Sequence, residues 1–105
     1  MLEITDGSWD ERVAAEPTPV LVDFWATWCK PCRVLEPVVE DIAERYAGQL
    51  TVGRINVDDN PAAAQRNTVL ALPTLILFRE GEEVERIVGA VKPKKIERAL
   101  ARHLE

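Results

Sequence analysis

The chemistry of this sequence centres on its only two cysteines, Cys29 and Cys32, which are separated by Lys30 and Pro31. The apolar run before them, residues 20–26, is typical of a buried strand, and the pattern after them is typical of a helix. Cys29 is therefore expected at a helix N-terminus, where unpaired N–H groups and the helix dipole stabilise a thiolate, the nucleophile of disulfide exchange. Cys32, one turn further in and more buried, would attack the resulting mixed disulfide.

Two other functions are open to this cysteine pair. A structural bridge across so short a loop would restrict the unfolded chain by only about 2 kcal/mol. Structural zinc needs four ligands, commonly two such pairs or one pair with two histidines. The sequence offers one pair and one histidine, His103, near the other end of the chain. The strand–helix context favours redox chemistry over both alternatives, and no metal site is expected.

Asp23 is the second residue suited to chemistry, because it interrupts the apolar run a few residues before Cys29. A lone buried carboxylate is costly unless it is paired or neutralised. With a raised pKa, this carboxyl would accept or donate the proton of the Cys32 thiol, directly or through a water. The alternative is a carboxylate on a strand edge that faces solvent. We favour the first interpretation, because perturbed acids concentrate at functional sites.

The rest of the pattern predicts the elements that position these residues. Strands are expected at residues 2–4, 20–26, 50–57, 74–78 and 84–89, and helices at about 9–15, 31–46, 61–66 and from 93 onward. A kink is expected at Pro37, and the inward stripe of that helix is expected to include Val34 and Leu35. The order implies an α/β fold with parallel strands, helices on both faces and a late hairpin of antiparallel edge strands.

Composition narrows the class of protein. The 105 residues fit one domain over 1–105, and 47% hydrophobic residues can build its core without disulfide staples. The net charge of −5 argues against nucleic acid as a main partner, since phosphate binding needs clustered Lys and Arg. The first ten residues carry no Lys or Arg, unlike a secretory signal. No apolar stretch approaches the roughly 20 residues that span a bilayer. A cytoplasmic protein is therefore expected.

These residues resemble the thioredoxin family. The resemblance is densest from Val20 to Pro37, with Val-Asp-Phe-Trp-Ala and Trp-Cys-x-Pro-Cys-Arg. It continues in collinear order over essentially the whole chain, at Asn56-Val57-Asp58, Asn60-Pro61, Leu72-Pro73-Thr74-Leu75, Phe78, Gly81 and Val88-Gly89-Ala90. It implies a thioredoxin fold, with a five-stranded mixed sheet flanked by four helices.

The resemblance also implies roles for single residues. Cys29 would attack, Cys32 would resolve, and Asp23 would handle protons beneath Cys32. The base rate of a cis bond before Pro73 is only about 5%, but the family implies that this bond is cis and that the proline packs against the disulfide. A flat apolar rim for an extended substrate segment would consist of Trp28, Leu72, Pro73, Val88, Gly89 and Ala90.

Three residues are expected to tune the redox properties of the cysteines: Lys30, Pro31 and Arg54. Lys30 and Arg54 depart from the family pattern, whereas Pro31 follows it. Lys30 stands where glycine is usual, and a cation beside Cys29 favours its thiolate and so the reduced form. This predicts a weaker reductant. Arg54 stands where the family usually places a lysine near the buried acid. Arginine cannot lose its charge, so Arg54 must pair with Asp23 or lean outward.

Two further departures from the family pattern lie shortly before Pro73. Asn67-Thr68 stands where Tyr-Gly is common, which would alter the turn. Leu70-Ala71 stands where a polar residue and glycine are frequent. Leu70 would either make the rim more apolar and shift partner preference, or be a partly exposed loop residue.

The resemblance implies a protein-disulfide reductase, a dithiol electron carrier recharged by a thioredoxin reductase that uses NADPH. The chain itself would bind no cofactor beyond its redox-active disulfide, and we expect a monomer whose partners are that reductase and disulfide-containing proteins. Two alternatives stay open. One is an oxidant or isomerase, toward which Lys30 leans. The other is a non-catalytic binding subunit that uses the same apolar rim.

Overall fold

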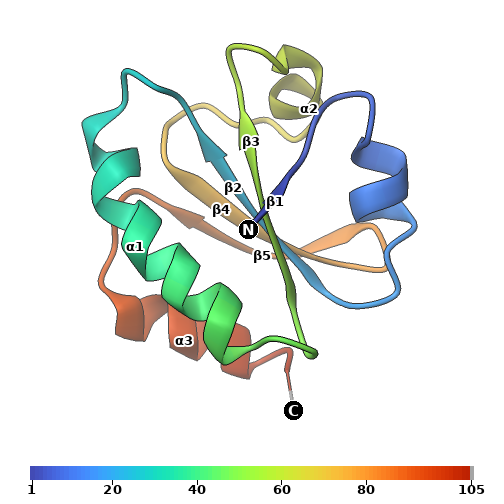
Figure 1. Cartoon of the computed structure of the whole chain (residues 1–105), viewed down its shortest axis with the longest axis vertical. Helices are drawn as coiled ribbons and strands as arrows, with labels where there is room; N and C mark the ends of the chain where they lie inside the picture. The colour runs from blue at the N-terminus through green and yellow to red at the C-terminus, as the bar shows by residue number, and fades with distance from the viewer. Residues whose placement is uncertain (105) are drawn as a thin grey trace.

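The structure is a computed structural model that describes residues 1–104. Five strands form one sheet in the order β1-β3-β2-β4-β5, with β1, β3 and β2 parallel, β4 antiparallel to β2, and β5 antiparallel to β4 (Figure 1). The strands are β1 (Leu2–Glu3), β2 (Val20–Trp25), β3 (Thr51–Asn56), β4 (Thr74–Arg79) and β5 (Glu82–Val88). The helices are a short one at Asp10–Ala14, α1 (Lys30–Arg45), α2 (Pro61–Arg66) and α3 (Pro93–Ala101).

The expected α/β thioredoxin fold is confirmed, with one change to the predicted hairpin. We expected both of its strands at an edge of the sheet. Instead β4 lies inside the sheet between β2 and β5, so that only β5 forms the edge. All of β4 except Arg79 is buried, which matches its nearly continuous apolar sequence.

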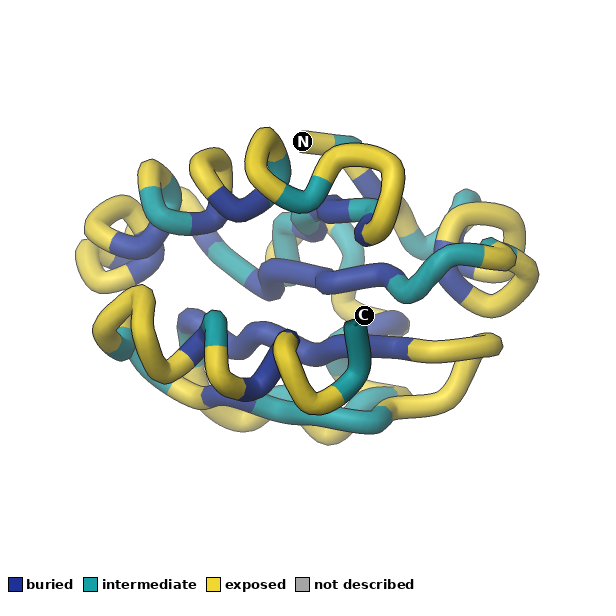
Figure 2. The backbone as a smooth tube through the Cα atoms, turned by 90° about the horizontal axis from the view of Figure 1, so that it is seen from below, coloured by how far each residue is buried: buried dark blue, intermediate teal, exposed yellow. Residues whose placement is uncertain are grey.

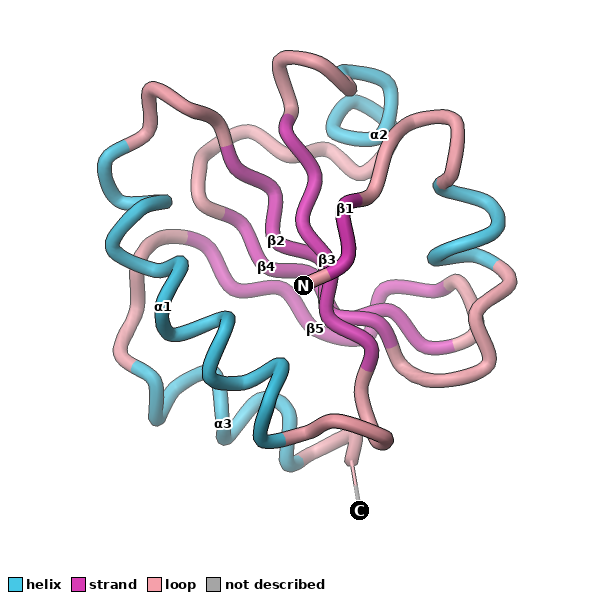
Figure 3. Tube along the Cα trace, viewed as in Figure 1, coloured by secondary structure: helices cyan, strands magenta, loops and turns pink. Residues whose placement is uncertain are grey.

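Two helices cover each face of the sheet, and the strands lie between them (Figures 1 and 3). α1 and α3 share a core cluster with Leu21 of β2, whereas the helix at Asp10–Ala14 and α2 share another with Val22 and Phe24. Side chains alternate between the two faces along a strand. Asp23 therefore projects toward the face that α1 covers. Figure 2 shows the buried strands between helices that expose their outer sides.

The first helix is shorter than expected and is π-helical. The N–H of Ala15 donates to the carbonyl of Asp10, five residues earlier, at 2.8 Å. Just before it, the Trp9 ring packs edge-on against Phe78, with 5.3 Å between centroids, and lies 6.1 Å from Phe24. Trp9 therefore fills the core and takes no part in the disulfide region.

The altered turn after α2 has a specific support. Thr68 adopts a φ of 52°, a left-handed conformation that glycine reaches more readily. Arg86 of β5 donates hydrogen bonds to the carbonyls of Thr68, at 3.0 Å, and Asn67. These bonds tie the turn to the sheet edge.

No helix among residues 1–104 is both long enough and apolar enough to cross a membrane.

Candidate active site

The two cysteines lie where the loop after β2 turns into α1. They form a disulfide with 5.3 Å between their Cα atoms. Cys29 is the N-cap residue of α1, and its Sγ accepts a hydrogen bond from the backbone N–H of Cys32 at 3.2 Å. The positive end of the helix therefore points at the Cys29 sulfur, the arrangement that stabilises a thiolate.

The expected difference in burial between the cysteines is absent from the disulfide form. Each is 4% exposed, and together with Ala26 they form a small cluster against which Trp25 and Leu72 pack. Both cysteines are equally buried while they are bonded, so any greater accessibility of Cys29 would have to arise on reduction.

The residues of the predicted rim lie in three segments of the chain: the loop after β2, the loop before β4 and the end of β5. The Leu72–Pro73 peptide bond is cis, and the carbonyl of Pro73 accepts a hydrogen bond from the N–H of Gly89 at 2.8 Å. Pro73 itself is buried. Trp28 and Val88 are 66% and 53% exposed, and Ala90 is exposed too.

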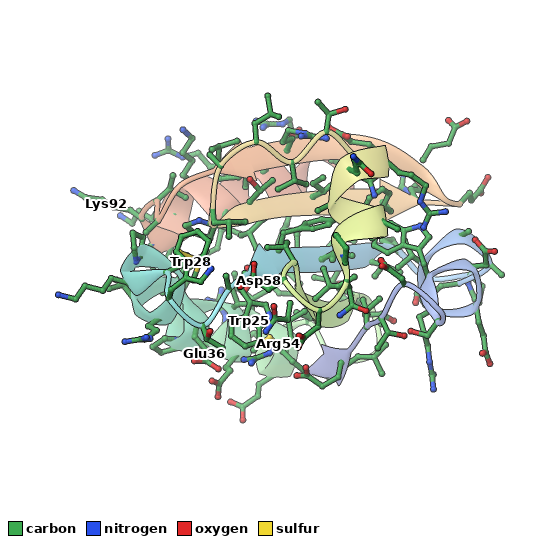
Figure 4. The ribbon with its side chains drawn as sticks, turned by 90° about the horizontal axis from the view of Figure 1, so that it is seen from above. Trp25, Trp28, Glu36, Arg54, Asp58 and Lys92 are labelled. Carbon is green, nitrogen blue, oxygen red and sulfur yellow. A yellow bond between two sulfur atoms is a disulfide. The ribbon has the colours of Figure 1, made fainter. Side chains whose placement is uncertain are left out.

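Two apolar side chains at or near the predicted rim, those of Trp28 and Leu70, lie at the surface. The Trp28 indole Nε1 donates to Oδ2 of Asp58 at 2.9 Å, which fixes the ring at the surface (Figure 4). Leu70 is 90% exposed. It therefore adds apolar surface in the loop that leads to Leu72 and Pro73.

Asp23 lies beneath the disulfide and is only 3% exposed. It lines a cavity of about 30 Å³ together with Trp25, Cys32, Arg33, Glu36 and Arg54. Its Oδ1 accepts no hydrogen bond from any described residue. The cavity is large enough for a water and has polar groups on its wall. Asp23 and Cys32 thus line the same water-sized cavity.

The acidity of Asp23 follows from this environment. Burial raises its pKa from 3.8 to about 7, the charge of Arg54 lowers it in part, and the charge of Glu36 raises it. A carboxyl with a pKa near 7 gains and loses a proton under physiological conditions.

Arg54 leans outward, the second of the two predicted arrangements. Its Nη1 donates to Oε1 of Glu36. Its Nε lies 2.9 Å from Oε2 of Glu3 as an ion pair, although the N–H does not point at that oxygen. The guanidinium carbon is 4.0 Å from the ring centroid of Trp25, in a cation–π contact. Figure 4 shows Trp25, Glu36 and Arg54 close together.

Glu36 is a residue that the sequence analysis missed. It follows Cys32 by four positions in α1, and residues four apart lie on the same face of a helix. That spacing was the available signal.

A larger cavity of about 520 Å³, lined by residues including Pro19, Arg79 and His103, contains none of the predicted site residues. Within residues 1–104, no three His, Cys, Asp or Glu side chains are placed to hold a metal ion.

Residues 1–102 match the sequence model of the thioredoxin family. The chain belongs to the thioredoxin family. Thioredoxin 1 of Nostoc sp. is 41% identical over 102 residues, which cover 97% of this chain and 95% of that protein. Thioredoxin of Mycobacterium tuberculosis is 51% identical over 89 residues, 85% of this chain and 77% of the relative. A bifunctional thioredoxin reductase/thioredoxin of Mycobacterium leprae is also 51% identical over 89 residues, which form 19% of its length.

Thioredoxins are protein-disulfide oxidoreductases, and this chain has the disulfide that such activity requires. Family membership and the cysteine pair at bonding distance together make it a disulfide reductase that exchanges its dithiol with disulfides of target proteins. Cys29–Cys32 is its redox-active disulfide.

Proposed function

We propose that this thioredoxin reduces target proteins with Cys29 as the nucleophile and Cys32 as the resolving thiol. The Cys29 thiolate attacks a target disulfide, forms a mixed disulfide and releases one target thiolate. Cys32, as a thiolate, then attacks the Cys29 sulfur, reforms the Cys29–Cys32 bond and releases the second target thiolate. Two electrons pass from the protein to the target. The observation that carries this order is the N–H of Cys32 on the Cys29 sulfur at the start of α1.

Asp23 is the proton carrier for the second attack. Cys32 must lose its proton to become nucleophilic, and the buried carboxyl shares a water-sized cavity with it. The proton passes from the Cys32 thiol to the Asp23 carboxylate, directly or through a water, and leaves to solvent afterwards. A pKa of about 7 suits both halves of this transfer at neutral pH.

An extended segment of the target docks on the rim around the disulfide. Trp28 and Val88 supply exposed apolar surface on either side, and the chain around Pro73 and Gly89 supplies backbone groups. Leu72 and Ala90 complete this surface. Leu70 extends it, so partners with an apolar residue near the disulfide would be favoured.

A thioredoxin reductase that uses NADPH recharges the disulfide. The name of the Mycobacterium leprae relative, which joins both activities in one chain, supports this partnership. We further propose that residues 1–105 act as one monomeric thioredoxin domain. A reducing compartment such as the cytoplasm fits a chain whose two cysteines form a redox pair.

The test is reduction of insulin by the full chain with NADPH and a bacterial thioredoxin reductase. We expect NADPH to be consumed in step with insulin reduction, and we expect the double variant Cys29→Ser/Cys32→Ser to be inactive. Failure to accept electrons from the reductase, combined with ready oxidation of reduced peptides, would identify an oxidant instead. A cellular role that survives in the double variant would identify a binding subunit.

Replacing Lys30 by glycine is expected to lower the reduction potential by about 10 to 30 mV, up to a tenfold change in the equilibrium constant. Lys30 is the exposed first residue of α1, directly after Cys29. Its positive charge favours the thiolate and so the reduced form. Equilibration with a glutathione buffer measures the potential. Lys30→Gln should act in the same direction and Lys30→Arg should leave the potential unchanged. An unchanged or raised potential in Lys30→Gly would refute this role.

A further inference from the structure

Arg54 lies in a row of charged side chains that crosses three strands. In the parallel pairing, Arg54 of β3 is in register with Glu3 of β1 on one side and with Asp23 of β2 on the other. Residues paired in register project to the same face of a sheet. Arg54 therefore has one carboxylate toward the sheet edge, where Glu3 is exposed, and one carboxyl toward the interior, where Asp23 is buried.

The structure shows with which carboxylates Arg54 forms ion pairs. Among the described residues it forms ion pairs with Glu3 and Glu36, whereas no ion pair joins it to Asp23. Its guanidinium rests on the Trp25 ring, on the wall of the cavity. The side chain of Arg54 is 19% exposed, and that of Glu36 is 41% exposed. The Glu36 contact is thus made at the solvent side of the cavity.

The groups that face Asp23 from the neighbouring elements explain why it matters which carboxylates pair with Arg54. β3 supplies Arg54, α1 supplies Glu36 and Arg33 at the cavity wall, and β4 supplies the apolar Leu75 in register. Arg33 donates to the carbonyl of Thr27. Arg54 is therefore the cation in register beside Asp23, and an arginine cannot lose its charge. Unless its guanidinium is held elsewhere, pairing with a buried carboxylate is its most favourable contact.

We propose that Glu36 is a positioning residue, which together with Glu3 holds the Arg54 guanidinium on Trp25 and so leaves Asp23 without a cationic partner. This inference rests on the proposed role of Asp23 as the proton carrier for Cys32. An Asp23–Arg54 ion pair would stabilise the ionised carboxylate, so that Asp23 would no longer take up the proton of Cys32. The pair would also fill the space that the proton transfer uses. Glu36 makes a permanently charged arginine compatible with a carboxyl that must change charge.

A direct effect of Glu36 is the rival explanation. The negative charge of Glu36 alone disfavours ionisation of Asp23, without any movement of Arg54. The two explanations differ in one respect. Positioning requires Arg54, whereas direct repulsion acts equally whether or not the arginine is present.

The test is a double-mutant cycle on the pKa of Asp23 in the oxidised full-length protein, measured by carboxyl carbon NMR. The variants are Glu36→Gln, Arg54→Gln and the two together, with Glu40→Gln as a control that removes an exposed charge from the same helix. Glutamine and glutamate have similar helix propensities, so the half-exposed position 36 tolerates the change. We expect Glu36→Gln to lower the pKa of Asp23 by about one unit or more, because an opposite charge within ion-pair range has that effect. The same change in the Arg54→Gln background should have a much smaller effect, and Glu40→Gln should have almost none.

An equal fall of the Asp23 pKa in both backgrounds would overturn the proposal in favour of direct repulsion, and an unchanged pKa in Glu36→Gln would overturn it outright. The Arg54 Nε resonance gives a second measurement, since the ring current of Trp25 should shift it in the wild type and lose that effect in Glu36→Gln. The dependence of turnover on pH separates the proton-carrying role of Asp23 from the positioning role of Glu36. A lowered Asp23 pKa with an unmoved turnover profile would remove the proton-carrying role of Asp23 while the positioning by Glu36 stands.

Discussion

Replacing Asp23 by asparagine is expected to raise the free energy of unfolding by about 4 kcal/mol at pH 8 and by almost nothing at pH 3. The carboxyl has a pKa near 3.8 when unfolded and about 7 when folded. Its contribution to stability is therefore complete below pH 4 and is lost as the pH rises from about 4 to 7, because the folded protein must then bury a charge. Asparagine has nearly the same shape and does not titrate, so it avoids this loss.

Urea denaturation of the oxidised protein at both pH values measures the difference. Asp59→Asn, which changes an exposed carboxylate, serves as the control and should stay within about 0.5 kcal/mol of the wild type at either pH. A gain of equal size at pH 3 and pH 8 would show that ionisation of Asp23 is not its cause. The same Asp23→Asn variant should slow turnover at neutral pH while mixed disulfides still form at the normal rate, because only the second attack needs the proton carrier.

Replacing Cys32 by serine should reduce turnover by roughly a thousandfold or more and convert the protein into a trap. Cys29 still attacks, because its place at the start of α1 is unchanged, but no second thiol is present to release the target. Incubation with a peptide disulfide followed by mass spectrometry should show one peptide joined to Cys29.

Cys29→Ser is the matched control, since it keeps one cysteine at the same site and should form almost no adduct. The reverse pattern, with adducts on Cys32 in Cys29→Ser and none in Cys32→Ser, would exchange the roles of the two sulfurs. The absence of any adduct in both variants would contradict the exchange mechanism.

The features that the sequence predicted well are those set by local pattern. The run Val20–Trp25 is apolar and rich in β-branched and aromatic residues, which predicted a buried strand. The helix was expected from about Pro31 with Cys29 at its N-terminal end, and α1 begins at Lys30 with Cys29 as its N-cap. Asp23 stood out because it broke that run, and its burial is confirmed. The cis bond before Pro73 came from the resemblance alone, because local statistics favour the trans form.

The features that the sequence left open depend on residues brought together by the fold. Arg54 forms its ion pairs with Glu3 on β1 and Glu36 on α1, which no local pattern relates to it. The inward stripe of α1 was drawn too wide. Leu35 is 1% exposed and lies on the core face, whereas Val34 is 69% exposed, because consecutive residues of a helix point about 100° apart. The predicted kink at Pro37 stays a prediction.

The rate of alkylation of Cys29 against pH, in the reduced full-length protein with peptide mapping, tests most directly whether the start of α1 activates this sulfur. We expect Cys29 to react well before Cys32, with a rate that rises with pH and has its midpoint clearly below pH 8.5, the ordinary pKa of a free thiol. A midpoint at or above that value, with both cysteines reacting at the same rate, would contradict this expectation.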